Sequence, residues 1–327
     1  MKKLFLITAA LVSAFLFCSC NEEDEPKVNQ DSEWTKFDEA ELDAIHVLYD
    51  SLHLADCCEY KDWSIMDSPG YVGQKGGGYF KNVTKYYGLT HQYDSLTNRY
   101  IVTSMKFSVL PQRDDISLPD VFGSFKHLKS FIMEVPDGAS IVIPKTLCDC
   151  PLTTLKITPA VWESANIVKS PLPENFGNLA ETLESLEICQ TELGNDLLEY
   201  VKEFKNLKEC TLRDNNFTGK VPYLPWANAA FCFNNNHFTE FDWRYVGNYQ
   251  EFDRLCIEDW STVPRFRYNE IEGPLPSYIN QEFFYLLDRK DYWRPGWFLE
   301  TFLGFNPIIK EYLELYTKYT GQIQTLE

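Results

Sequence analysis

The stretch from Leu207 to Pro222, LKECTLRDNNFTGKVP, constrains the fold of this chain more than any other segment. Its residues Leu207, Cys210, Leu212 and Asn215 fall at offsets 0, 3, 5 and 8. Residues two apart on a strand point to the same side, so Cys210 and Leu212 should face inward and the residue between them outward. An Asn at offset 8 can turn the chain and satisfy backbone groups that the turn leaves unpaired. One such unit cannot bury its own apolar face, so the chain needs further copies.

The rest of the chain supplies these copies. Units that start at residues 128, 152, 183, 207, 228 and 261 repeat the apolar triplet or its Asn-anchored tail. The recurring positions outside the first unit are Leu128, Phe131 and Met133; Leu152, Leu155 and Ile157; Leu183, Leu186 and Ile188; Phe231, Phe233 and Asn236; and Phe266 and Asn269. We therefore predict an array of about six repeats over residues 111–279, in which short strands stack side by side.

The spacing and the tail of the Leu207 unit resemble the leucine-rich repeat, and the tail resembles its plant-type variant. The resemblance implies an α/β solenoid: a right-handed superhelix with a short parallel β-sheet on its concave side and an irregular convex side. Such arrays need a cover at each end, because an open stack leaves an apolar face and a free sheet edge.

Residues 34–110 are expected to form a helical and β N-terminal cap. Asp38 followed by Glu41 has the spacing of a capping box, which predicts a helix that starts there. A strand pair should follow, with its turn near Thr97-Asn98. Residues 280–327 are expected to form an aromatic C-terminal cap that includes a short amphipathic helix from Ile308 to Tyr319. Five aromatic residues before this helix are expected to cover the last coil: Trp293, Trp297, Phe298, Phe302 and Phe305.

Residues 1–20 have the pattern of an export signal, with Lys2 and Lys3 before an apolar run that ends at a Cys. The run resembles the leader of a bacterial lipoprotein, which implies that Cys20 is lipidated; Cys18 and plain secretion are the alternatives. The following NEEDEP resembles the acidic export tag of surface lipoproteins of gut-type Gram-negative bacteria. We therefore expect a disordered acidic tether over residues 21–33 and a lipid-anchored protein on the exterior of the outer membrane.

A formal charge of -18 argues against nucleic acid or anionic lipid headgroups as partners, because phosphate is bound by Lys and Arg. Membrane contact is expected only through the lipid anchor, and we expect a monomer. None of the five histidines belongs to a recognisable metal or catalytic motif, and no nucleophile motif is present. The sequence therefore predicts no cofactor, no metal and no enzyme, with a glycoside hydrolase as a distant alternative.

Eight cysteines remain after the leader, and an exported protein permits disulfides. Cys210 occupies an inward repeat position and is expected to act as a small buried hydrophobe. Cys189 and Cys232 are expected to point outward on coils too far apart to pair. We favour few or no disulfides.

The candidate ligand-binding residues project from the outward positions of the predicted strands, except Tyr268, which is adjacent to one of them. Arg and Tyr are common at interface hot spots, so the C-terminal end of the concave face is the candidate patch, although the same charges could simply solvate an exposed face. The candidates are Arg213, Arg265, Arg267, Tyr268, Lys156, Glu187 and Asn234.

The predicted ligand is an extracellular protein or a glycan. An alternative function is glycan capture beside an outer-membrane uptake system. Exposed aromatic residues would favour this alternative, and its candidates for stacking on sugars are Trp162, Trp226, Trp243 and Trp260.

Overall fold

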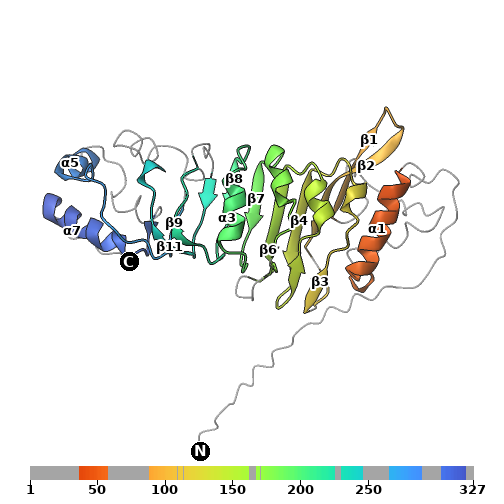
Figure 1. Cartoon of the computed structure of the whole chain (residues 1–327), viewed down its shortest axis with the longest axis horizontal. Helices are drawn as coiled ribbons and strands as arrows, with labels where there is room; N and C mark the ends of the chain where they lie inside the picture. The colour runs from red at the N-terminus through yellow and green to blue at the C-terminus, as the bar shows by residue number, and fades with distance from the viewer. Residues whose placement is uncertain are drawn as a thin grey trace, which may run out of the picture.

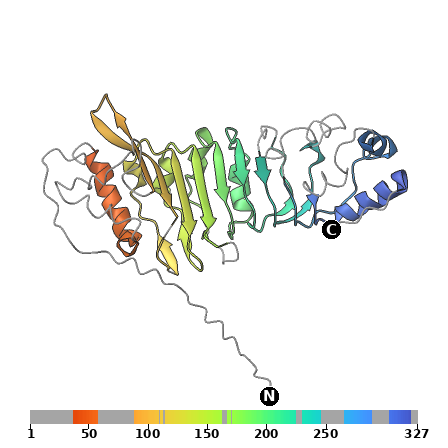
Figure 2. The same cartoon turned by 180° about the vertical axis from the view of Figure 1, so that it is seen from behind.

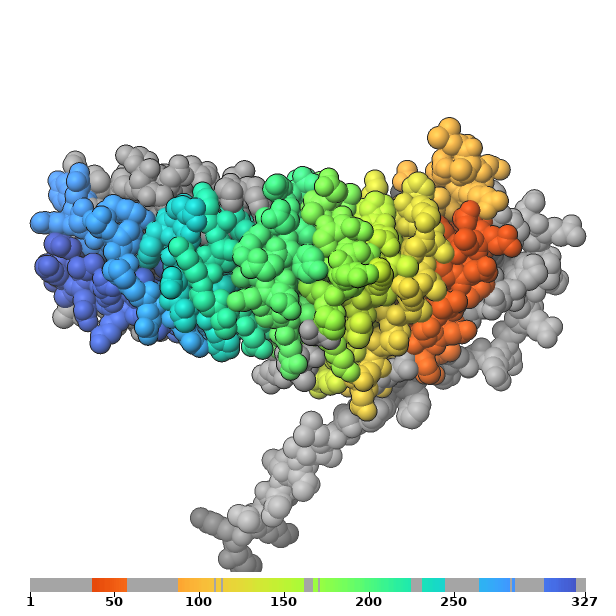
Figure 3. All heavy atoms as spheres, in the orientation of Figure 1, coloured from red at the N-terminus to blue at the C-terminus, as the bar shows by residue number. Residues whose placement is uncertain are grey.

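A computed structural model describes residues 37–57, 88–108, 110–112, 114–161, 167–169, 171–224, 230–245, 265–288 and 303–321. The molecule is elongated, with helix α1 at one end and α7 at the other (Figure 1). Successive segments of the chain follow one another along the long axis (Figure 3). The leader with Cys18 and Cys20, the tether, and the predicted covering residues Trp293, Trp297, Phe298 and Phe302 lie outside the described residues.

Short strands alternate with short helices along the chain. The helices are α1 (Glu39–Ser51), α3 (Asn195–Val201), α5 (Gln281–Asp288) and α7 (Ile308–Thr320), with 3-10 turns η2 (Leu54–Asp56), η5 (Phe122–Ser124), η6 (Lys145–Asp149), η7 (Phe176–Glu181) and η8 (Trp243–Tyr245). The strands are β1 (Leu89–Asp94), β2 (Arg99–Phe107), β3 (Asp115–Ser117), β4 (Ser130–Val135), β5 (Ser140–Val142), β6 (Thr154–Pro159), β7 (Ser185–Ile188), β8 (Glu209–Thr211), β9 (Thr218–Lys220), β10 (Ala230–Cys232) and β11 (His237–Glu240).

The main sheet has seven strands in the order β1-β2-β4-β6-β7-β8-β10 (Figure 2). Only β1 and β2 pair antiparallel; the other neighbours are parallel. The predicted strand pair of the N-terminal cap is thus confirmed, and its second strand also begins the parallel array. Each parallel strand is one repeat further along the chain, which is the arrangement of a solenoid.

The predicted apolar triplets form the core of the array. Phe131, Leu155, Leu186, Cys210 and Phe231 lie opposite one another on successive strands, and each is at most 1% exposed. The alternation along each strand explains this burial, because every second side chain points to the inside of the coil. Cys210 is confirmed as a buried apolar side chain.

The opposite side of the coils carries the 3-10 turns η5, η6 and η7 and helix α3. Apolar side chains from these segments close the core from that side; Phe176, for example, packs its ring against Phe204 at a centroid distance of 5.8 Å. Two further sheets have two strands each and pair β3 with β5 and β9 with β11.

Buried asparagines join each coil to its neighbour in the C-terminal half. Asn236 Oδ1 accepts hydrogen bonds from the backbone N–H groups of Asn215 at 2.9 Å and Phe217 at 3.2 Å, and its Nδ2 donates to the Leu212 carbonyl at 3.1 Å. Asn215, Asn269 and Asn306 make equivalent bonds, each to the coil that precedes its own. The role predicted for the Asn at offset 8 is confirmed, and the series continues past residue 279 to Asn306.

The N-terminal helix differs from its prediction in one contact. Asp38 caps α1 as expected, since its Oδ1 accepts from the Ala40 N–H at 3.0 Å. Glu41 was predicted to close a capping box, but it is only 2% exposed and its Oε2 accepts from the Val102 N–H on β2 at 2.9 Å. This bond attaches the helix to the sheet, and desolvation raises the pKa of Glu41 to about 7.

Helix α7 confirms the predicted amphipathic segment, with Ile308, Ile309, Tyr312 and Tyr316 buried. Phe305 was predicted to cover the last coil. The structure places it at the surface instead, 47% exposed, because the preceding Leu303 and the following Asn306 take the buried positions of the turn.

Candidate ligand-binding surface

The outward side of the main sheet, here called the sheet face, carries one row of side chains that crosses all the parallel strands. Strand register places these residues opposite one another: Lys106, Ile132, Lys156, Glu187, Thr211, Cys232 and, through a single parallel bridge, Arg265. The charged side chains in the first half of the row form ion pairs. Arg265 lies at the other, C-terminal end of the row.

Lys156 and Glu187 are neighbours on β6 and β7, and their charged groups form an ion pair at 3.5 Å. A second pair on the same half, Lys106 with Glu134, has a separation of 3.8 Å. Exposed pairs of this kind contribute about 0.2–1 kcal/mol. Lys156 and Glu187 were both predicted as ligand contacts, and the structure brings them together with each other.

Arg213 and Arg265 both lie close enough to the half-buried Cys232 thiol to lower its pKa, although burial has the larger, raising effect. Burial raises the pKa of the Cys189 thiol on the preceding coil to about 12, although hydrogen bonds with Arg213 partly oppose the rise. The prediction that Cys189 points into solvent is wrong. Its short side chain is fully buried because the next coil covers it, with the thiol 3.8 Å from the Thr211 carbonyl oxygen.

Asn234 lies between Arg213 and Arg267 on the intervening coil. Its Oδ1 accepts a hydrogen bond from the Arg267 backbone N–H at 2.8 Å. The side chain predicted to bind a ligand therefore also joins two coils, and it fixes the backbone from which Arg267 projects.

Tyr268 and Phe305 form a stacked pair at the C-terminal end of the sheet face. Their ring centroids are 4.2 Å apart, their planes differ by 6°, and each residue is 47% exposed. The Tyr268 N–H donates to the Gly304 carbonyl oxygen at 3.0 Å, which holds the two turns together. The guanidinium carbon of Arg267 lies 5.4 Å from the Tyr268 centroid and 5.1 Å from that of Phe305. Cations this close to aromatic rings are attracted to them.

Both aromatic residues have a backbone conformation that bulky side chains rarely adopt. Tyr268 has φ 56° and Phe305 has φ 61°, in the left-handed region. Each directly precedes a buried asparagine of the series, as do Asp214 and Asn235 on earlier coils, which also have positive φ. Strain of this kind costs about 1–3 kcal/mol per residue, whereas an aromatic pair adds about 0.5–1.5 kcal/mol. Stacking alone thus does not offset the strain of two aromatic residues at these positions.

Of the seven predicted contacts, the structure gathers Arg267 and Tyr268 into one cluster with Phe305, which the sequence reasoning assigned to the cap. A signal for Phe305 is present in the sequence. Phe266-Arg267-Tyr268-Asn269 and Leu303-Gly304-Phe305-Asn306 share the order apolar, variable, aromatic, Asn.

The structure describes one of the tryptophans proposed for glycan stacking, and the environment of this residue does not support that role. Trp243 is half-buried and packs edge-on against Phe241 at a centroid distance of 5.0 Å. Trp162, Trp226 and Trp260 lie outside the described residues.

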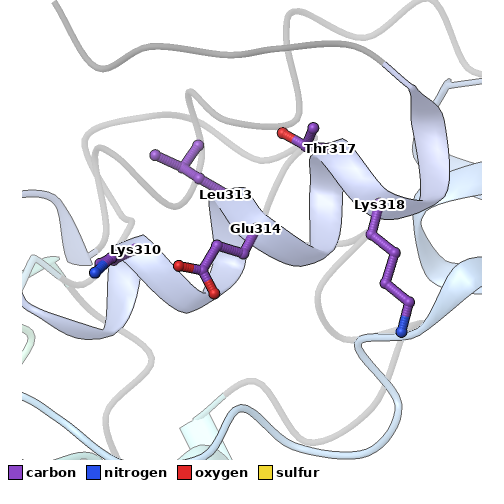
Figure 4. A pocket seen from close by; sticks show the side chains of 5 residues that line it. All are labelled: Lys310, Leu313, Glu314, Thr317 and Lys318. Atoms are coloured by element: carbon purple, nitrogen blue, oxygen red, sulfur yellow. The ribbon is translucent and has the colours of Figure 1, made fainter.

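Other surface features of the described residues give weaker support for a ligand site. A groove of about 560 Å³ lies along α7, but its described lining comes from one helix face (Figure 4): Lys310, Leu313, Glu314, Thr317 and Lys318. The described part of the chain contains no group of three or more metal-ligating side chains. No helix in that part is long and apolar enough to cross a membrane. The six cysteines that it includes are free thiols.

No family model matches the sequence, and no curated protein does. Among solved structures, the leucine-rich repeat ectodomain of the receptor kinase SOBIR1 from Arabidopsis thaliana matches 63% of this chain and 99% of its own, with a TM-score of 0.41 and 17% identity. A plant ice-binding protein matches 73% of this chain and 66% of its own, with a TM-score of 0.48 and 16% identity. The BIR2 ectodomain from Arabidopsis thaliana matches 46% of this chain and 74% of its own, with a TM-score of 0.30 and 16% identity.

The described part of the chain has a leucine-rich-repeat-like solenoid fold. The repeated strands, their register and the buried asparagines carry that conclusion, and the similarity scores are too low to add a function to it.

Proposed function

We propose that this protein is a binding scaffold that holds a protein or glycan ligand against the C-terminal end of its sheet face. The observation that carries the proposal is the exposed, strained stack of Tyr268 and Phe305 beside Arg267. Arg265, two residues away and exposed, adds a second cation to a chain whose formal charge is -18.

The mechanism is preorganisation. Asn234 accepts a hydrogen bond from the Arg267 N–H, and Asn269 donates to the Phe233 and Phe266 carbonyls. These bonds fix the backbone around the Arg267–Tyr268 segment, so little chain entropy remains to be lost when a ligand binds. The neutralised half of the face, with its Lys156–Glu187 pair, then acts as a solvated border.

The test uses the fragment that starts at Ser32 on arrays of extracellular-matrix proteins and host glycans. We expect a hit that weakens at least about tenfold when Arg265 and Arg267 are both changed to Ala. The matched control is the double change Lys156→Ala and Glu187→Ala, which alters the same face and should leave binding within about twofold. Binding that ignores the arginine changes, or no hit on either array, would overturn the proposal.

We also propose that the protein is a monomer displayed on the outer face of the outer membrane through a lipid on Cys20. The leader and the acidic NEEDEP segment support this proposal. Labelled palmitate should be incorporated by the wild type and by a Cys18→Ala variant but not by a Cys20→Ala variant. Incorporation that is lost only in the Cys18 variant would move the anchor to that residue.

A further inference from the structure

The aromatic pair occupies positions where earlier coils use polar residues. Asp214 and Asn235 tolerate positive φ because their short polar side chains can hydrogen-bond locally. Tyr268 and Phe305 have no such compensation, yet both are held exposed in this conformation by the asparagines that follow them. Strain that the surroundings maintain at an exposed position points to a functional contact.

The geometry leaves the outer faces of the stack clear of Arg267. Its guanidinium carbon is nearly equidistant from the two centroids, at 5.4 and 5.1 Å, while the rings are only 4.2 Å apart. The guanidinium group therefore lies beside the stack, level with the gap between the rings. A ligand can meet an aromatic face and the guanidinium edge at the same time.

We propose that this stack binds one ring of an acidic glycan. The C–H face of a sugar ring would lie on the aromatic surface, and Arg267 would bind the carboxylate of that sugar or of its neighbour through paired N–H groups. Asn235 is exposed at the equivalent position on the preceding coil; its amide bonds to Asp214 and has further hydrogen-bonding capacity for hydroxyl groups. This inference rests on the proposed function and names the ligand class for the same surface.

A sugar fits this site better than a protein side chain does. Anchoring side chains at protein interfaces fill desolvated pockets. Here the planes of the two rings are parallel and in contact, so no space is left between the rings for a side chain to insert. What remains is a flat apolar surface with a charged, polar border, which matches a ring that has an apolar face and a polar rim.

Affinity electrophoresis of the Ser32 fragment tests the inference, with polygalacturonate, alginate and hyaluronan as acidic probes. Dextran and methyl-esterified polygalacturonate are the neutral controls. We expect retardation by at least one acidic polymer, and a loss of affinity of roughly tenfold in Tyr268→Asn and Phe305→Asn. Arg267→Gln should remove the preference for the acidic over the esterified polymer. Tyr93→Asn changes an equally exposed tyrosine at the other end of the sheet and should have no effect.

Folding is followed separately by Tm. Asn occupies the equivalent position on the preceding coil, so Tyr268→Asn should keep or raise the Tm. If that variant is destabilised instead, Arg267→Gln, which leaves both rings in place, decides the outcome.

The inference is overturned if none of the acidic polymers retards the protein, if the ring variants bind as well as the wild type, or if Arg267→Gln keeps the acidic preference. A protein hit on the matrix array that depends on Arg265 and Arg267, without any polysaccharide binding, would leave the proposed function standing and refute the glycan assignment.

Discussion

Glu41 on helix α1 accepts a hydrogen bond from the backbone N–H of Val102 on β2, 61 residues away, at 2.9 Å. The carboxyl group is buried, and this burial is the main reason why its pKa rises from 4.5 to about 7. Helix α1 is therefore attached to the sheet through a group that the folded protein prefers to keep protonated.

Stability should consequently fall as pH rises through the range between these two pKa values. Below pH 4.5 Glu41 is protonated in both states; above pH 7 it is ionised in both, and the folded state bears a cost of about 3 kcal/mol. Glu41→Gln should raise the free energy of unfolding by about this amount at pH 8 and change it little at pH 4. Urea unfolding at both pH values measures the difference, and an equal effect at both would show that ionisation is not involved.

The contribution of Asp242 to stability depends on pH in the opposite direction. Its carboxylate accepts from Arg244 at 2.8 and 2.6 Å and lies 3.4 Å from Lys220, and the Arg244 hydrogen bond is the main cause that lowers its pKa to about 2. The stabilisation is present above pH 3.8 and is lost as pH falls through 2. Asp242→Asn should cost about 2 kcal/mol at pH 7, and the cost should shrink steadily below pH 4. A cost that stays constant down to pH 2 would contradict this assignment.

The buried asparagines should be the most sensitive polar positions of the array. Asn236→Ala removes an acceptor for two backbone N–H groups and a donor to the Leu212 carbonyl, all buried, at about 1–3 kcal/mol for each group left unpaired. We expect a loss of at least 3 kcal/mol in the free energy of unfolding, an estimate from those per-group costs. Asn178→Ala, at an exposed position, is the control and should stay within about 0.5 kcal/mol. Similar losses in both variants would mean that the series does not hold the coils together.

Phe233 lies at the centre of the aromatic core in the C-terminal half. Its ring stacks on Phe266 with a centroid distance of 5.6 Å and contacts Phe217 at 6.4 Å. Phe233→Ala should cost about 3–5 kcal/mol, because it leaves a cavity between two coils. Leu96→Ala, at a residue that is 95% exposed, should change the stability by less than about 0.5 kcal/mol. Chemical denaturation compares the two, and a loss below 1 kcal/mol for Phe233→Ala would contradict the packing described.

The array could be predicted from the sequence because its signals are local. The spacing of Leu207, Cys210, Leu212 and Asn215 encodes a strand and a turn within nine residues, and the same spacing recurs. Burial of these residues then follows from the alternation of side chains on a strand. Helix α1 and the strand pair of the cap were predictable for the same reason.

The misassigned residues are those whose environment comes from another coil. Glu41 had the spacing of a local capping box, but its partner lies 61 residues away. Cys189 was assigned outward by alternation, and only the fold shows that the next coil covers it. Strand register likewise brings Lys156 and Glu187 together as an ion pair that their sequence positions did not indicate, while their contact with a ligand stays a prediction.

The candidate site was predictable in part. Arg267 followed from the outward positions of the last repeat, and Tyr268 was included as the residue next to it. Phe305 was missed because the long interval after Ile271 hid one more turn of the same kind, and the aromatic-Asn pair at its end was assigned to a cap. The stacking of Phe305 on Tyr268 required the spatial repeat.

The most direct test of the binding surface is covalent footprinting of the Ser32 fragment with and without the ligand that the arrays identify. Hydroxyl-radical labelling of Tyr268 and Phe305 should fall at least about threefold when the ligand is bound, since both rings are exposed in the free protein. Tyr93, equally exposed at the opposite end of the sheet, should label at an unchanged rate. Protection at Tyr93 with none at Tyr268 and Phe305 would place the ligand elsewhere and contradict the account.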